Sequence, residues 1–336
     1  TLDGAADFDF FGSGLGFLSG SVTSTAVFNP VQDSLGRIYV VGDFNSYNGV
    51  STAYGIARFN IDGTLDSTFN AGVGFANPGG TIRRPNDLVI EPGTDKIFVC
   101  GYFTQYSGSS SGRIVKINTD GTIDTSFNVG TGFSGGPGGT TTFGKCVRVD
   151  SKGRVVVGGN FNSYSGSSVT PQICRLKADG TVDTSFSGGS GPFQSTGGQQ
   201  YIYTLEVEPR TDKIYFSSYV STYSGSTGFS GLVKTNENGS VDTTFSAKPG
   251  LGVYYGFPIG SVPGGTGYVF PSKNGIVIDP DDLSLYLVGA FGSFNTTGSN
   301  GIIKLTCSGA IDTTFNYGTG LTASYAGAPT NATQNI

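Results

Sequence analysis

A stretch of 11 residues recurs five times along this chain, and its spacing constrains the fold more than any other feature of the sequence. The copies are NIDGTLDSTFN from Asn60, NTDGTIDTSFN from Asn118, KADGTVDTSFS from Lys177, NENGSVDTTFS from Asn236 and TCSGAIDTTFN from Thr306. Their glycines (Gly63, Gly121, Gly180, Gly239 and Gly309) are separated by 58, 59, 59 and 71 residues. Regular spacing of this length is typical of an array of one supersecondary unit.

Each unit contains four strand-like segments, which in the first unit begin at Ala26, Arg37, Tyr54 and Thr64. The third and fourth segments are joined by Asp-Gly, Asn-Gly or Ser-Gly, and the first two pairs are typical of tight hairpins. The 56 glycines and the abundant Ser and Thr also favour short strands over helices. We therefore expect an all-β fold, a β-propeller of about five four-stranded blades with an extra N-terminal strand.

The repeat predicts blades at about 24–75, 81–133, 140–193, 196–250 and 266–321, followed by a tail at 322–336. Residues 1–23 hold the extra strand, because Thr1, Leu2 and Asp3 match the end of a repeat. Three alternatives are open: the strand closes the ring, is the stub of a preceding unit, or pairs with another subunit. Since the chain begins with Thr1 and has no Met, we expect a processed form or a fragment.

A basic residue precedes the last aspartate of every motif by eight positions. The pairs are Arg58 and Asp66, Lys116 and Asp124, Arg175 and Asp183, Lys234 and Asp242, and Lys304 and Asp312. Because each pair flanks one hairpin, we interpret it as a repeated ion pair or hydrogen-bonding anchor, with five binding pockets as the alternative. The motif is interpreted as a turn and not as a calcium loop, because Asn238 and Ser308 replace the first aspartate in two copies.

A second pattern, G-x-F-x-x-Y-x-G, recurs in phase with the first. It places Phe44 and Tyr47, Phe103 and Tyr106, and Phe161 and Tyr164 at equivalent positions. An aromatic ring repeated at one place in every blade predicts core packing between neighbouring blades, with the glycines allowing close backbone approach.

These residues resemble the delta-60 repeat β-propellers of bacteria and their phages, whose repeat reads approximately DGKI-x-V-x-G-x-F followed by R-L-x-x-DG-x-x-D-x-x-F. The matching segments here include GRIYVVGDF with ARFNIDGTLDSTF and GRVVVGGNF with CRLKADGTVDTSF. The fourth unit departs from the pattern at Ser217 and Ser218, and the fifth has Ser284 in place of the basic residue. The resemblance implies a propeller on secreted, surface or virion proteins, and it brings no catalytic residues.

Composition narrows the function classes. The net charge is −5 and the basic residues are scattered, so we expect no nucleic-acid partner. Apolar runs are too short for membrane insertion. The absence of His removes Ser-His catalysis and imidazole metal sites, and we expect no cofactor and no metal. We interpret Cys100, Cys146, Cys174 and Cys307 as buried thiols, and not as disulfides or a metal cluster.

One unit carries an insertion of about a dozen residues between Phe245 and Asn274, and this accounts for the spacing of 71. Five aromatic residues lie there among Gly and Pro, namely Tyr254, Tyr255, Phe257, Tyr268 and Phe270. Because a scaffold would repeat such a loop, we predict a ligand-binding role for these residues, by sugar stacking or protein contact. The alternative is an insertion that only packs on its own blade.

Taken together, the sequence predicts a structural or adhesive module and not an enzyme. We expect it outside the cell, on a phage tail or fibre or on a bacterial surface, with other structural proteins of that assembly and a surface glycan as partners. A homo-oligomer is left open. The alternatives are a carbohydrate-active enzyme, for which Asp281 and Asp282 are the nearest acidic pair but fit a polar turn better, and a calcium-dependent adhesin.

Overall fold

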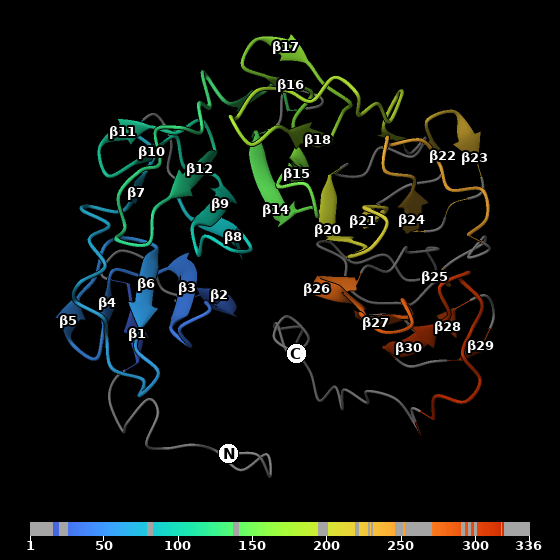
Figure 1. Cartoon of the computed structure of the whole chain (residues 1–336), viewed down its shortest axis with the longest axis horizontal. Coiled ribbons are helices and arrows are strands. Elements are labelled where there is room, and N and C mark those ends of the chain that lie inside the picture. The colour runs from blue at the N-terminus through green and yellow to red at the C-terminus, as the bar shows by residue number, and fades with distance from the viewer. Residues whose placement is uncertain are drawn as a thin grey trace, which may run out of the picture. The chain divides into compact units, whose positions relative to one another are not determined.

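The computed structural model of the chain describes residues 16–19, 26–78, 83–136, 141–193, 201–218, 222–227, 229, 231–245, 251–252, 271–289, 293–294, 297–298, 301–316 and 318. All elements in these ranges are β-strands, and they form sheets of three strands (Figure 1). No helix suited to crossing a bilayer occurs in these ranges. The prediction of an all-β chain is confirmed.

Each repeat contains one larger sheet. The larger sheets comprise β2 (Ala26–Gln32), β3 (Ile38–Asp43) and β6 (Ile56–Phe59); β8 (Pro85–Ile90), β9 (Ile97–Gly101) and β12 (Ile114–Ile117); β14 (Phe143–Val149), β15 (Val155–Asn160) and β18 (Ile173–Leu176); β20 (Ile202–Val207), β21 (Ile214–Ser218) and β24 (Leu232–Thr235); and β26 (Pro271–Ile278), β27 (Leu285–Gly289) and β30 (Ile302–Leu305). The second strand in each repeat is central, as in the orders β2-β3-β6 and β20-β21-β24. Strand β9 is buried at every position, which explains its continuous apolar sequence.

A smaller sheet joins each repeat to the segment before it. The smaller sheets comprise β1 (Phe17–Leu18), β4 (Ser46–Tyr47) and β5 (Val50–Ser51); β7 (Phe75–Ala76), β10 (Gln105–Tyr106) and β11 (Ser109–Ser110); β13 (Phe133–Ser134), β16 (Ser163–Tyr164) and β17 (Ser167–Ser168); β19 (Pro192–Phe193), β22 (Thr222–Tyr223) and β23 (Ser226–Thr227); and β25 (Leu251–Gly252), β28 (Ser293–Phe294) and β29 (Thr297–Gly298). Phe17 pairs with Tyr47 as Phe75 pairs with Tyr106. The N-terminal strand therefore takes the place that the end of a preceding repeat would take, while residues 1–15 lie outside the described residues.

The expected fourth strand of each blade is corrected by the structure. In the first repeat the segment from Thr64 makes a single bridge, between Phe59 and Leu65, and then turns. The turn forms because the Asp66 carboxylate accepts hydrogen bonds from the backbone and hydroxyl of Thr68, which bends the chain away from the sheet. Leu176 with Val182 and Thr235 with Val241 show the same single bridge.

The described chain divides into two compact units. One comprises Thr1–Val157, Ser163–Ser168 and Leu176–Val182, and the other comprises Gly158–Asn162, Val169–Arg175 and Asp183–Ile336. The core of the first unit includes Tyr39, Val41, Leu88, Val99, Phe103 and Val115, and that of the second includes Tyr215, Leu232, Ile276, Leu287 and Ile303. Apolar strand residues form both cores, as the repeat pattern predicts.

Candidate functional site

The structure brings together each basic residue and aspartate that share a motif. The shortest N–O distances are 2.8 Å for Arg58 and Asp66, 3.7 Å for Lys116 and Asp124, 2.7 Å for Arg175 and Asp183, 3.9 Å for Lys234 and Asp242, and 3.4 Å for Lys304 and Asp312. The first four pairs are buried, and the fifth is more exposed. In each pair the basic residue lies in the last strand of the larger sheet, and the aspartate follows the next turn.

Each aspartate is kept ionised by its surroundings. Burial alone would raise the pKa of Asp66, but hydrogen bonds from Thr68 and the Arg58 guanidinium lower it overall. The same balance lowers the pKa of Asp183, where Ser185 and Arg175 take these roles. These carboxylates are held in their ionised form by local donors.

The basic residues also connect successive repeats. An Arg58 nitrogen donates to the Thr119 carbonyl, Arg175 Nη1 donates to the Glu237 carbonyl at 2.5 Å, and Lys234 Nζ donates to the Cys307 carbonyl at 3.3 Å. Each acceptor lies in the turn of the following repeat. The cationic head is therefore enclosed by its own repeat and the next one, which makes it a structural joint.

The anchor occurs in two forms that alternate through the first four repeats. Arg58 and Arg175 serve in repeats one and three, where the preceding hairpin is closed by the pairs Asp33–Arg37 and Asp150–Arg154, each at 2.7 Å. In repeats two and four a lysine replaces the arginine and gains a glutamate: Lys116 lies 2.7 Å from Glu91, and Lys234 lies 3.0 Å from Glu208. A lysine ammonium lacks the planar fork by which a guanidinium binds a carboxylate through two parallel hydrogen bonds, and in these two repeats a second carboxylate and a second lysine complete the cluster. The second lysines are Lys96 and Lys213, each 2.9 Å from the motif aspartate.

The Asp-Gly turn is a second part of the joint. Asp62 Oδ1 accepts hydrogen bonds from the Thr64 backbone at 3.0 Å and the Thr64 hydroxyl at 2.7 Å, which explains its place in the motif. In the next repeat, a Cβ on Gly121 would come within 2.6 Å of the Asn70 backbone. Asn70 N donates to the Asp120 carbonyl there at 2.8 Å. The glycine is needed both for its positive φ and for this contact between repeats.

The recurring aromatic residues form buried clusters with the phenylalanine of the preceding smaller strand. Phe75 lies 4.4 Å from Phe103 and 4.9 Å from Tyr106 between ring centroids, and Tyr106 donates to the Gly121 carbonyl at 2.8 Å. Phe17 has the same relation to Phe44 and Tyr47 in the first repeat. These rings join consecutive segments of the array and fill the core.

Other predicted residues have varied placements. Cys100, Cys146 and Cys174 are buried free thiols, whereas Cys307 is exposed because it lies in the turn after β30 and not in a strand. Asp279 and Asp282 each accept a backbone hydrogen bond from two residues further on, which identifies this acidic segment as a pair of turns. The predicted ligand-binding residues Tyr254, Tyr255, Phe257, Tyr268 and Phe270 lie outside the described residues.

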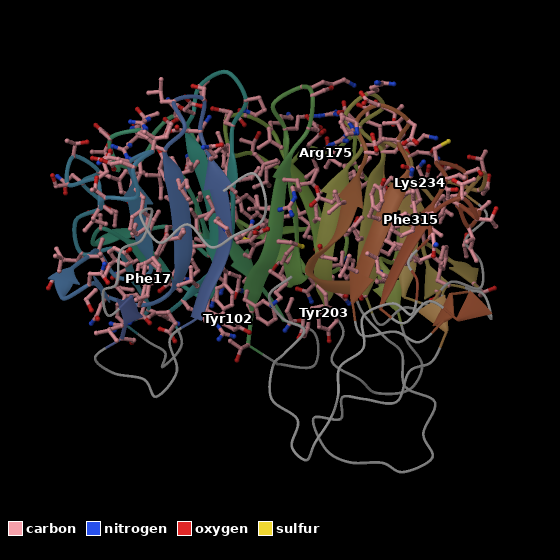
Figure 2. All side chains as sticks on the ribbon, turned by 90° about the horizontal axis from the view of Figure 1, so that it is seen from below. Phe17, Tyr102, Arg175, Tyr203, Lys234 and Phe315 are labelled. Atoms are coloured by element: carbon pink, nitrogen blue, oxygen red, sulfur yellow. The ribbon has the colours of Figure 1, made fainter. Side chains whose placement is uncertain are left out.

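Near the start of the first strand of each larger sheet lie two positions whose residue type changes from repeat to repeat. These positions are called the row below. Three positions before Asp87 stands Arg84, and its equivalents in the next two repeats are Phe143 and Tyr201. One position before Asp87 stands Asn86, with Phe28, Lys145 and Tyr203 as equivalents. Figure 2 shows Tyr203 at the opposite edge of its unit from Arg175 and Lys234. The sequence analysis did not predict this row. The signal that could have revealed it is a change of residue type at equivalent positions of the repeat.

Three solved structures similar to the chain have low sequence identity. A catalytically inactive variant of virginiamycin B lyase from Staphylococcus aureus, with quinupristin, is 12% identical over 88% of this chain and 71% of its own, with a TM-score of 0.43. A gluconolactonase from Xanthomonas campestris is 14% identical over 86% of this chain and 75% of its own, with a TM-score of 0.43. The extracellular domain of a one component system from B. thetaiotaomicron is 10% identical over 86% of this chain and 33% of its own, with a TM-score of 0.38.

These structures correct one prediction. The prediction that the chain is not an enzyme is contradicted, because a lyase and a lactonase are among the similar structures. Fold alone gives no ground for assigning or excluding an activity.

The family comparison agrees with the repeat seen in the sequence. No curated protein matches the chain. A model described as a domain of unknown function (DUF5122) beta-propeller matches residues 36–69, 94–127, 153–186, 211–245 and 284–315, which together make up about half of the chain. Each match includes the anchor pair and the intervening turn of one repeat, and the prediction of a five-repeat β-propeller is confirmed. The chain belongs to the DUF5122 beta-propeller family.

Proposed function

We propose that the chain is a structural and adhesive β-propeller module exposed on a virion, such as a phage tail or fibre, or on a bacterial cell surface. It presents residues at the strand ends and loops to a glycan or protein partner. The observation that carries this proposal is the division between repeated and unrepeated positions. The anchor pair recurs in every repeat and is buried in the first four, whereas Phe28, Asn86 and Lys145 differ at one equivalent position.

The small hairpins support a display role. Strands β5, β11 and β17 are exposed at both residues and consist of Val50–Ser51, Ser109–Ser110 and Ser167–Ser168. Short, uncharged side chains on a rigid array suit a surface that must stay folded outside the cell while its loops vary. The resemblance to delta-60 repeat proteins agrees with this setting.

The proposed partners are other structural proteins of the assembly and a surface glycan, and a second copy of the chain is a further candidate. On sequence grounds, the aromatic insertion with Tyr254 and Tyr268 is a second place where such a partner would bind. This part of the proposal rests on its concentration of aromatic residues in one unit only.

Immunogold labelling of intact cells and of virions from the same source tests the location. We expect label on the outer surface, and label confined to the cytoplasm would overturn the proposal. Adhesion is tested by binding fluorescent protein to host cells before and after periodate or protease treatment. Loss after periodate indicates a glycan partner and loss after protease a protein partner, whereas no binding to untreated cells would exclude adhesion.

A further inference from the structure

Two cationic side chains in the first unit stand apart from the paired ones described above. Arg84 directly precedes β8, and Lys145 lies in the neighbouring strand β14. Arg84 Nε is buried and has no hydrogen-bond partner among the described residues. Within the same part of the chain, no carboxylate forms an ion pair with either side chain. The basic residue of each motif has an aspartate partner. Two basic residues without a carboxylate partner are therefore unusual in this chain.

The carboxylate of Asp87, on β8, is occupied by other donors. Asp87 Oδ1 accepts from the Asn29 amide at 2.5 Å. Asp87 Oδ2 accepts from the Val147 backbone at 2.9 Å and from Arg148 at 2.8 Å. Both oxygens are committed to joining β2, β8 and β14, so the positive charge of Arg84 and Lys145 remains for an external anion.

Aromatic rings hold the guanidinium in place. The Arg84 Cζ atom lies 5.5 Å from the centre of the Tyr102 ring and 5.9 Å from the centre of the Phe28 ring. Tyr102 stacks on Phe143, with 4.4 Å between centroids and an interplanar angle of 29°. In Figure 2, Tyr102 lies at the edge of its unit. Stacking positions a guanidinium and leaves its N–H groups available to an acceptor.

The backbone around Lys145 is equally well fixed. Asn86 donates to the Gly144 carbonyl at 2.7 Å, and Arg113 donates to the Thr142 carbonyl at 2.9 Å. A Cβ on Gly144 would come within 2.7 Å of the Cys100 Cβ, so the glycine lets β14 approach β9 closely. The burial of Lys145 lowers its pKa, and the Arg84 charge lowers it further. A bound anion would relieve both effects.

We propose that Arg84 and Lys145 form a binding site for the carboxylate group of an acidic saccharide. The guanidinium gives a planar pair of donors and the ammonium a compact charge, a combination that matches an oxyanion. The flanking rings of Phe28 and Tyr102 offer apolar surface to the sugar ring that carries it. This inference rests on the proposed adhesive function and names the class of glycan.

Calorimetric titration of the full chain tests the site, with galacturonate as the acidic probe, galactose as the neutral probe and sodium sulfate as the free oxyanion. The variants are Arg84→Gln and Lys145→Gln, and Lys177→Gln serves as the control because Lys177 is exposed in the turn after β18. We expect galacturonate to bind and galactose not to bind. Each site variant should weaken galacturonate binding by about tenfold or more, because a hydrogen bond to a charged group is lost. The control should bind as the wild type does.

Unchanged galacturonate affinity in both site variants would overturn the proposal, as would galactose binding of equal strength. Binding of sulfate without galacturonate would show that the site takes only a free oxyanion, which also overturns it. Thermal unfolding of each variant separates a lost contact from a lost fold. Host-cell binding by a wild-type chain that does not bind galacturonate would leave the adhesive function standing while refuting this site. Galacturonate binding without cell adhesion would do the reverse.

Discussion

Arg58 and Asp66 form a buried ion pair at 2.8 Å, and the same guanidinium donates to the Thr119 carbonyl of the following repeat. One side chain therefore closes its own turn and fixes the next turn against it. Arg175 repeats both contacts with Asp183 and Glu237. The motif that resembles an acidic ligand loop in the sequence is in the structure a joint between repeats.

Replacing Arg58 with Met should destabilise the chain by about 3–5 kcal/mol, because Asp66 would remain buried without its counter-charge. Urea unfolding followed by circular dichroism measures the loss. The matched control is Lys177→Met, which removes an exposed cation and should change stability by less than about 0.5 kcal/mol. A loss for Arg58→Met as small as that of the control would mean that the pair contributes no more than a surface salt bridge.

Two glycines next to strands of the smaller sheets allow the cost of a strained φ to be measured separately from the cost of a steric clash. Gly132 has a φ of 73°, and a Cβ there would come within 2.1 Å of the Gly112 carbonyl oxygen. Gly166 has a φ of 80°, and a Cβ there would meet no atom within 4 Å. Gly166→Ala should cost about 1–2 kcal/mol for the strained φ alone. Gly132→Ala should cost at least about 2 kcal/mol more, because the strand must also move. Equal melting temperatures for the two variants would contradict this assignment.

Acid should weaken the second repeat through Asp124. Burial acts to raise its pKa, but hydrogen bonds from Ser126 and Lys96 lower the pKa of Asp124 to about 2 from a reference value of 3.8. The unfolded chain therefore binds more protons than the folded chain between these values, so stability is present above pH 3.8 and falls as the pH drops toward 2. The contribution is on the order of 1 kcal/mol after allowance for solvent screening.

The Asp124→Asn variant measures this contribution. We expect its stability to vary less steeply with pH than that of the wild type between pH 3.8 and 2, as followed by urea unfolding at each pH. Asp62→Asn, at an exposed turn, provides a second comparison in which no buried ion pair is lost. Parallel curves for Asp124→Asn and the wild type would show that this carboxylate does not contribute.

The repeat alone predicted the array, the turns and the residues of the anchor, because each depends on local sequence that recurs. It failed for the segment from Thr64, where strand-like residues are bent by the Asp66 carboxylate and its bonds to Thr68. It also overlooked Arg84 and Lys145, which are far apart in sequence: Arg84 directly precedes β8, and Lys145 lies in β14, which packs against β8. Only the contacts of β8 with β14 show that neither cation has an acidic partner among the described residues.

Lys145 should reduce the stability of the chain in the absence of a ligand. Burial of its ammonium is the main cause of its lowered pKa, followed by the Arg84 charge, while Cys146, Asp87 and Cys100 act in the opposite direction. A folded pKa below the reference value of 10.5 means that the unfolded chain binds more protons between the two values. The penalty is therefore complete below the folded pKa of Lys145, and it diminishes as the pH rises toward 10.5.

Replacing Lys145 with Met should accordingly raise the free energy of unfolding at neutral pH by about 1 kcal/mol, since a thioether side chain fills the same space without a charge. The difference between variant and wild type should shrink as the pH rises toward 10.5, which separates the charge from a packing effect. Chemical unfolding at a series of pH values measures both proteins, and taking their difference cancels tyrosine ionisation. A less stable Lys145→Met at neutral pH would show that the ammonium is already neutralised within the protein, and Arg84 and Lys145 would then lose their role as an unpaired cationic site.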